Sequence, residues 1–273
     1  MVSQDQRRRQ LAREKFLRQQ QRRTETRRKA QTRNAVIASV LGVVVVGSVV
    51  SFTTGVFTDD DKKANASAEV TPSASAPSKA PDPCQKPAPG KVEGLNWKKE
   101  PAMTIDTSAK YTMKLATTCG DIGIAMKTAA APHTVNSFDF LAKKGFFDHT
   151  KCHRLTTNGI YVLQCGDPQG TGAGGPGYTI PDENLKDTSL KGNVYPAGTV
   201  AMANTGQKHS GGSQFFLVYQ DSQLPPSYTP FGTIDAAGMS VLKKIAAAGE
   251  NTGAGDGAPN ATVVINKASV TKS

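Results

Sequence analysis

The sequence predicts a mainly β protein, in which an antiparallel β domain closed or capped by two helices follows one transmembrane helix and a disordered linker. Short runs of alternating apolar and polar residues follow one another from residue 111 onward, and only two stretches show helical spacing. A long uncharged run lies upstream, and a segment rich in Ala, Ser and Pro follows it. Because the strands and helices do not alternate, the pattern does not fit a parallel βαβ architecture.

Residues 1–34 form a basic segment, which we predict to be a cytoplasmic tail. The chain carries a formal net charge of +11, and this segment alone holds 12 Lys/Arg and 3 Asp/Glu. The remaining residues hold 21 Lys/Arg and 19 Asp/Glu, so the excess charge belongs to the tail. We therefore expect no nucleic-acid partner. The tail is either a solvated charge run or a contact for anionic lipid headgroups.

Residues 35–57 read AVIASVLGVVVVGSVVSFTTGVF, without a charge, and are predicted to form a transmembrane helix. At about 1.5 Å per residue such a helix crosses a hydrocarbon core of about 30 Å. Arginines before the run and TDDDKK after it place the N-terminus in the cytoplasm and the rest outside the cell membrane, in a single-pass arrangement. The alternative is a cleaved signal peptide, since ANA at 64–66 resembles a cleavage site.

Residues 58–104 are predicted to be a linker, because Ala, Ser, Pro and Lys dominate and few apolar side chains are available to bury. The folded domain is predicted over 105–273. Trp97, the one tryptophan of the chain, falls in the linker.

Four cysteines lie on the predicted outer side of the membrane, where disulfides persist: Cys84, Cys119, Cys152 and Cys165. Cys152 opens one predicted strand and Cys165 closes the next, which allows a cross-strand bridge and leaves Cys84 to pair with Cys119. Four cysteines permit three connectivities, and free buried thiols are the alternative. None has the C-x-x-C spacing of a metal site, and we expect neither metal nor cofactor.

The domain begins with a hairpin and a helix. Residues 111–117 and 122–126 alternate as strands, with a turn at 119–121 between them. The helix spans 132–145, with Thr134 as its candidate N-cap and Gly145 as its stop. Its apolar stripe consists of Val135, Phe138 and Leu141.

Further strands are predicted at 152–156, 161–165, 198–204, 213–219 and 231–234, followed by a helix at 239–248 and a strand at 262–270. Two motifs between them are interpreted as structural. GTGAGG at 170–175 matches a nucleotide-binding fingerprint, but PGYTIPDEN follows instead of a helix, so we predict a loop with positive φ angles. Ser213 and His209 lack the elbow motif and the acidic partner of a hydrolase.

Three segments together resemble the cyclophilins, the peptidyl-prolyl cis-trans isomerase family. They are FFDHTKCHRL with YVLQCGDPQGTGAGGPGY, then GTVAMANTGQKHSGGSQFFLVY, and the closing PFGTI. The ordered set covers about residues 109–271. The resemblance implies an eight-stranded closed antiparallel barrel capped by two helices, and an enzyme that rotates X-Pro peptide bonds.

Carried over residue by residue, the resemblance places Arg154 at the catalytic arginine of the family. The substrate-binding positions implied in the same way are Tyr161, Val162, Gln164, Ala203, Asn204, Gln214, Phe216, Leu224 and Tyr228. Compared with the family's pattern, two extra residues separate Arg154 from Gln164. Gln223 lies near the sequence position at which the family has a tryptophan important for recognising cyclosporin. Sensitivity to that inhibitor therefore does not follow from the resemblance.

The implied chemistry suits these residue types, because bond rotation needs a fixed hydrogen-bond donor and an apolar pocket, with no nucleophile. The expected partners are proline-containing polypeptides, such as exported proteins during folding, and we expect a monomer. The alternative function is a proline-peptide binding module of the same fold with little or no turnover.

Overall fold

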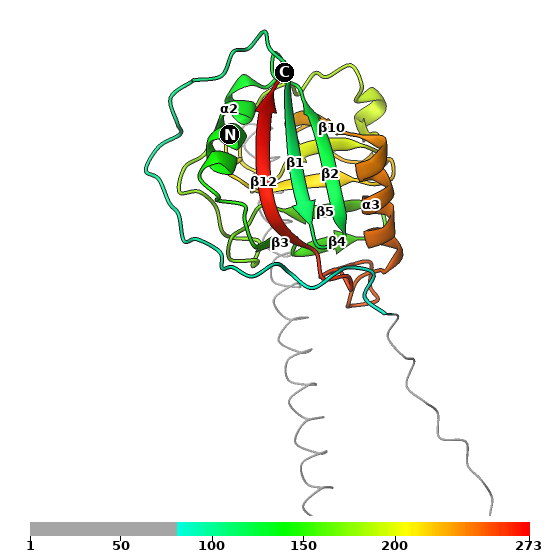
Figure 1. Cartoon of the computed structure of the whole chain (residues 1–273). Helices are drawn as coiled ribbons and strands as arrows, with labels where there is room; N and C mark the ends of the chain where they lie inside the picture. Colours follow the sequence, from blue (N-terminus) through cyan, green and yellow to red (C-terminus); the bar gives the residue numbers. More distant parts are fainter. Residues whose placement is uncertain (1–80) are drawn as a thin grey trace, which may run out of the picture. The chain divides into compact units, whose positions relative to one another are not determined.

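A computed structural model describes residues 81–273, and in this part the chain folds around a strongly curled antiparallel sheet (Figure 1). The strands are β1 (Tyr111–Thr117), β2 (Gly120–Met126), β3 (Thr150–Lys151), β4 (Arg154–Thr156), β5 (Val162–Cys165), β6 (Val194–Tyr195), β7 (Thr199–Met202), β8 (Phe215–Val218), β9 (Ser222–Gln223), β10 (Pro230–Ile234), β11 (Asp256–Gly257) and β12 (Val264–Lys272). The helices are α2 (Pro132–Lys143), α3 (Ala236–Ala247) and the short 3₁₀ helix η1 (Lys191–Asn193).

The main sheet has the order β11-β4-β5-β8-β7-β10-β2-β1-β12-β3, and β6 pairs with β9 separately. The predicted closed eight-stranded barrel is therefore observed as a curled sheet with two ends. Eight strands of three or more residues stand consecutively in this order, and the two-residue strands β11 and β3 end it. Strands β3 and β4 belong to one segment, 150–156. Because β12 pairs with β3 and β11 pairs with β4, the two ends of the curled sheet come together on that segment.

The β1–β2 hairpin is confirmed: Tyr111 pairs with Met126 and Thr117 with Gly120. Alternate side chains of these strands point to the inside of the curled sheet, where Met113, Leu115 and Ile124 are almost fully buried. Aromatic rings from α2, the following loop and the sheet fill the centre of the core: Phe138, Phe147, Phe215 and Phe231.

Helix α2 packs against β12 (Figure 1), and the residues of its predicted apolar stripe belong to the core. The predicted N-cap is wrong, because the helix begins after Ala131 and Thr134 lies inside its first turn. The carboxylate of Glu183 caps the helix instead, accepting the backbone N–H groups of His133 at 3.0 Å and Thr134 at 2.8 Å. The stop at Gly145 is confirmed by its φ of 71°.

Helix α3 packs against β2 (Figure 1), and a side chain caps its N-terminus. Asp235 accepts the N–H of Gly238 at 2.6 Å, and Leu242 and Ile245 are buried beneath the helix. The GTGAGG segment is a loop, as predicted, in which Gly170 and Gly172 have φ angles of 64° and 84°.

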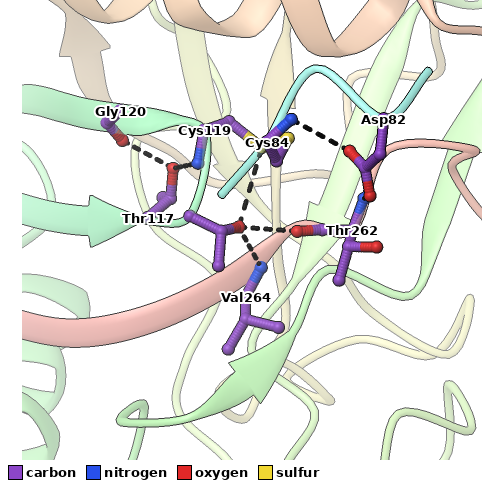
Figure 2. Close-up of a disulfide and its surroundings, with 8 residues drawn as sticks. Asp82, Cys84, Thr117, Cys119, Gly120, Thr262 and Val264 are labelled. Carbon is purple, nitrogen blue, oxygen red and sulfur yellow. Dashed lines mark hydrogen bonds between the residues drawn. A yellow bond between two sulfur atoms is a disulfide. The ribbon is translucent and has the colours of Figure 1, made fainter. Parts of the chain in front are cut away.

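Residues 82–104, here called the strap, differ from the predicted linker, because they lie against the domain without forming a helix or strand (Figure 1, cyan). A disulfide joins Cys84 to Cys119 in the β1–β2 turn (Figure 2). Asp82 accepts the N–H of Cys84 at 2.9 Å and that of Thr262 at 3.0 Å, which ties the strap to the start of β12. The composition of residues 82–104 indicated a linker because it offers few apolar side chains to bury. One disulfide and a few hydrogen bonds and ring contacts are nevertheless enough to hold the strap against the domain.

Trp97 fixes the far part of the strap. Its ring packs edge-on to Phe140 of α2 with centroids 5.0 Å apart and also contacts Phe146 at 6.0 Å. Its backbone N–H donates to the carbonyl of Pro176 at 2.8 Å. The one tryptophan of the chain therefore contributes to the folded domain.

The second disulfide joins Cys152 to Cys165, so the pairing allowed by strand positions is confirmed and the free-thiol alternative is wrong. The predicted tail 1–34, transmembrane helix 35–57 and first part of the linker lie outside the described residues. Within residues 81–273 no helix is both long and apolar enough to span a membrane.

Candidate active site

The candidate site lies on the face of β4, β5 and β8 that points away from the core inside the curled sheet. Residues alternate between the two faces of a strand, so Leu163 and Leu217 enter the core. Val162 and Phe216 point to the other side, into a second apolar cluster with Leu224. Because side chains alternate along each strand, one face of the sheet carries the core residues and the other face carries the site residues.

Strand register brings the polar and apolar site residues into one row. Arg154 pairs with Gln164 on the next strand, Gln164 with Phe216, and Phe216 with Ala201. Neighbouring strands lie about 4.8 Å apart, so a guanidinium, a carboxamide and a phenyl ring stand side by side. The Cys152–Cys165 disulfide lies beside the first two positions of this row and crosses the same pair of segments.

A chain of hydrogen bonds fixes the polar side chains. Arg154 Nη1 donates to Gln164 Oε1 at 3.1 Å, and Gln164 Nε2 donates to Gln214 Oε1 at 2.8 Å. Gln214 Nε2 in turn donates to the carbonyl of Gly174 at 2.9 Å. On its other edge Arg154 donates from Nε and Nη2 to the two carboxylate oxygens of Asp256, at 2.7 and 2.8 Å.

The ion pair keeps both partners charged. The hydrogen bonds to Asp256 raise the pKa of the Arg154 guanidinium, and those from Arg154 lower the pKa of the Asp256 carboxyl. Solvent reaches both groups, because the side chains are 39% and 55% exposed. The guanidinium can therefore contact a bound molecule from solution.

A cavity of about 170 Å³ lies beside the guanidinium. It is lined by Arg154, Ile160, Val162, Gln164, Ala203, Asn204, Phe216, Leu224 and Tyr228. The ring of Tyr228 stands edge-on to Phe216 with centroids 5.4 Å apart. Behind them the buried Tyr195 hydroxyl donates to the Tyr228 carbonyl at 2.8 Å, and burial raises the pKa of Tyr195 to about 12.

Most of the predicted site residues meet at this cavity, but two lie elsewhere. Tyr161 packs against Tyr219, with centroids 5.8 Å apart, and is not among the lining residues. Gln214 acts through its hydrogen bond to Gln164. Two residues of the site were not predicted: Ile160, which lines the cavity from the β4–β5 connection, and Asp256, which is 102 residues from its partner.

A larger groove of about 990 Å³ continues from the cavity and shares Gln164, Ala203 and Asn204 with it. Glycine-rich backbone from the loop 172–177 forms one wall. The strap contributes Lys98 and Lys99, and among the described residues neither forms an ion pair. Glu100 of the strap lines the same groove, so these three side chains leave a net positive charge at its edge.

The remaining polar groups near the site have structural partners. The buried Ser213 hydroxyl donates to the carbonyl of Gly166 at 2.7 Å, and His209 Nδ1 accepts the N–H of Asp182 at 3.0 Å, so the two do not form a nucleophile and base pair. Across residues 81–273, no three His, Cys, Asp or Glu side chains gather as a metal site requires.

The sequence model of the family described as cyclophilin type peptidyl-prolyl cis-trans isomerase/CLD matches residues 112–270. A Mycobacterium leprae protein named "Probable peptidyl-prolyl cis-trans isomerase B" is 49% identical over 195 residues, which cover 68% of this chain and 62% of that protein. A Mycobacterium tuberculosis protein of the same name is 45% identical over 198 residues, covering 70% and 60%. The chain thus matches about three fifths of the length of these relatives.

A solved Cryptosporidium parvum cyclophilin type peptidyl-prolyl cis-trans isomerase shares the fold, with a TM-score of 0.50 and 24% identity, over 59% of this chain and 98% of that one. The family match lies within the described domain and includes the whole row from Arg154 to Phe216. The chain therefore belongs to the cyclophilin-type peptidyl-prolyl cis-trans isomerase family.

Proposed function

We propose that this protein catalyses cis-trans isomerisation of X-Pro peptide bonds in exported polypeptides. The observation that carries the proposal is the Arg154 guanidinium, held by Gln164 and Asp256 at the wall of a cavity bounded by Phe216 and Leu224. A pyrrolidine ring fits the apolar part of such a cavity. The charged donor then stands beside the amide that must rotate.

Rotation breaks no bond, so catalysis depends on stabilising a twisted amide. In the planar ground states the nitrogen lone pair is delocalised, and the barrier to rotation is about 20 kcal/mol. At the twisted transition state the lone pair is localised on nitrogen and accepts a hydrogen bond. Arg154 donates there and much less in either ground state, which is the differential binding that lowers a barrier.

One hydrogen bond does not account for a large acceleration. A rate increase of about 10⁵-fold needs about 7 kcal/mol, whereas one charge-assisted hydrogen bond contributes about 1.5–3 kcal/mol. The remainder comes from holding the substrate and stripping water from its amide. The apolar walls around Phe216 grip the ring, while Gln164 and the backbone at Ala203 and Asn204 hold the flanking peptide.

Two hydrogen bonds fix Asn204 in a position from which its backbone can hold the peptide. Its side chain donates to the Ser227 carbonyl at 2.7 Å and accepts the N–H of Gly206 at 3.0 Å, so its backbone is fixed beside the cavity. Residues next to the proline then extend into the larger groove.

The test is a protease-coupled isomerisation assay on an Ala-Pro peptide with the full-length chain. We expect the wild type to exceed the uncatalysed rate, and Arg154→Ala to remove at least nine tenths of kcat/KM. Lys151→Ala, an exposed lysine on β3, is the control and leaves the rate unchanged. A wild-type rate equal to the uncatalysed one refutes the proposal and favours a binding module without turnover.

We also propose that residues 35–57 anchor a monomeric enzyme in the cell membrane with its isomerase domain outside. The uncharged run and the flanking charges support this orientation. Added protease cleaves the domain from intact cells if the orientation is right and leaves it uncut if the domain is cytoplasmic.

A further inference from the structure

The carboxylate of Asp256 holds the catalytic candidate Arg154 along one edge of its guanidinium. Both oxygens are engaged, at 2.7 Å from Nε and 2.8 Å from Nη2, which is the bidentate geometry that suits an arginine fork. The backbone supports the contact as well, because β11 pairs with β4 at Asp256 with Thr156 and at Gly257 with Leu155. The carboxylate is thus anchored to the strand that carries the arginine.

The loop that presents Asp256 is itself fixed. Glu250 accepts the N–H groups of Thr252 at 2.5 Å and of Gly255 at 2.8 Å, which closes the turn before β11. The carbonyl of Gly255 accepts the N–H of Thr157, directly after the end of β4, at 2.9 Å. Gly255 adopts φ 89°, and a Cβ there would stand 2.5 Å from the Cβ of Asn158. The position of Asp256 therefore does not depend on its own side-chain bonds alone.

The consequence for Arg154 follows from its donors. A guanidinium has five N–H donors, and the hydrogen bonds to Asp256 and Gln164 use three of them. The other two, on Nη1 and Nη2, are left for a substrate. An arginine side chain has about 2 kcal/mol of rotamer entropy, and Gln164 alone restrains only one end of the fork. Asp256 fixes the second edge and with it the direction of the two available N–H bonds.

We propose that Asp256 is a positioning residue that orients the Arg154 guanidinium toward the twisted amide; this rests on the isomerase function proposed above. Asp256 acts through Arg154, so its removal disorders the donor without emptying the cavity. Arg154 donates to the amide nitrogen mainly in the transition state, so losing its orientation lowers kcat with little change in KM.

The experiment compares Asp256→Ala, Asp256→Glu and the double variant with Arg154→Ala in the full-length chain. Exchange spectroscopy on an Ala-Pro peptide, at concentrations from below KM to saturation, yields kcat and KM. We expect Asp256→Ala to lower kcat about tenfold, because misorientation by a fraction of an ångström weakens a directional hydrogen bond. Asp256→Glu keeps the carboxylate and recovers most of the loss. In the Arg154→Ala background, removal of Asp256 has no further effect.

Asp121→Asn is the matched control, since Asp121 forms an exposed ion pair of 2.7 Å with Lys114 away from the site. It leaves kcat unchanged. A spectroscopic readout separates positioning from stability: the Nε–H resonance of Arg154 exchanges slowly in the wild type and rapidly in Asp256→Ala.

The proposal is overturned if Asp256→Ala leaves kcat unchanged or raises it, or if the loss persists when Arg154 is absent. Failure of the isomerase function is a different result, since the wild type itself would then show no catalysis. A wild type that is active and sensitive to Arg154→Ala, with Asp256→Ala unaffected, defeats only the positioning role.

Discussion

The strap disulfide offers a test in which the magnitude follows from loop length. Replacing Cys84 and Cys119 by serine opens a loop with a sequence separation of 35 residues. In the chain-entropy treatment that cross-link contributes about 4 kcal/mol to the free energy of unfolding, whereas the Cys152–Cys165 bridge, with a separation of 13, contributes about 3 kcal/mol. The longer loop is therefore the more stabilising by about 0.9 kcal/mol.

Urea unfolding of the full-length chain measures these differences. For a domain of this size, about 4 kcal/mol corresponds to a fall in Tm of about 8–16 °C. Trp97, the one tryptophan, reports on the strap directly, because it packs on Phe140 and Phe146. We expect its emission to shift to longer wavelength in the Cys84/Cys119 double variant at urea concentrations where the Cys152/Cys165 variant keeps a native spectrum.

The matched Cys152/Cys165 double variant provides the contrast at the site. It lies beside Arg154 and Gln164, so it lowers isomerase activity more than the strap variant does while costing less stability. Loop length does not set the stabilisation if the strap variant unfolds at the wild-type urea concentration, or if the shorter loop proves the more stabilising. The first result would mean that the cross-link adds no stability beyond the noncovalent contacts of the strap, and the second that loop length does not set the order of the two effects.

Three further predictions address the site and its surroundings. Phe216→Ala removes the apolar wall of the cavity; we expect kcat/KM to fall at least tenfold and the free energy of unfolding to fall by about 3 kcal/mol, measured by the peptide assay and by urea. Burial lowers the pKa of His153 below its ordinary 6.5, so the unfolded chain binds a proton that the folded chain does not, and stability falls as pH drops below 6.5. His153→Leu should flatten the dependence of unfolding free energy on pH between 6.5 and 5, and an unchanged slope contradicts this assignment. Replacing Lys98 and Lys99 by glutamate reverses the charge at the groove edge. We expect kcat/KM to fall about threefold for peptides with an acidic residue beside the Xaa-Pro pair, as is usual for exposed charges, and to stay unchanged for neutral peptides.

Local pattern predicted the parts of the fold that depend on neighbours in sequence. The period of two identified the hairpin and the strands carrying Arg154, Gln164 and Phe216, because a strand sends alternate side chains to opposite faces. The apolar stripe of α2 followed from helical spacing in the same way. These features need only the geometry of one element.

Contacts between segments that are distant in sequence could not be predicted from local pattern, and the wrong N-cap of α2 is an example. Glu183 caps α2 from about fifty residues away, where the sequence suggested Thr134. Tyr161 is a separate case: it stands between Ile160 and Val162, which both line the cavity, and its own ring packs on Tyr219 instead. Sequence spacing does not predict which distant residues meet, because the curl of the sheet sets the distance between them.

By itself, the sequence determined which strands form, which face of each is apolar, and which ordered residues mark the cyclophilin-type family. Only the tertiary structure decided that the strap docks onto the domain and that Asp256 reaches Arg154 across 102 residues of chain. The physical reason is that alternation and helical spacing are properties of a single segment, whereas a disulfide or an ion pair between segments exists only when packing brings both partners to one place.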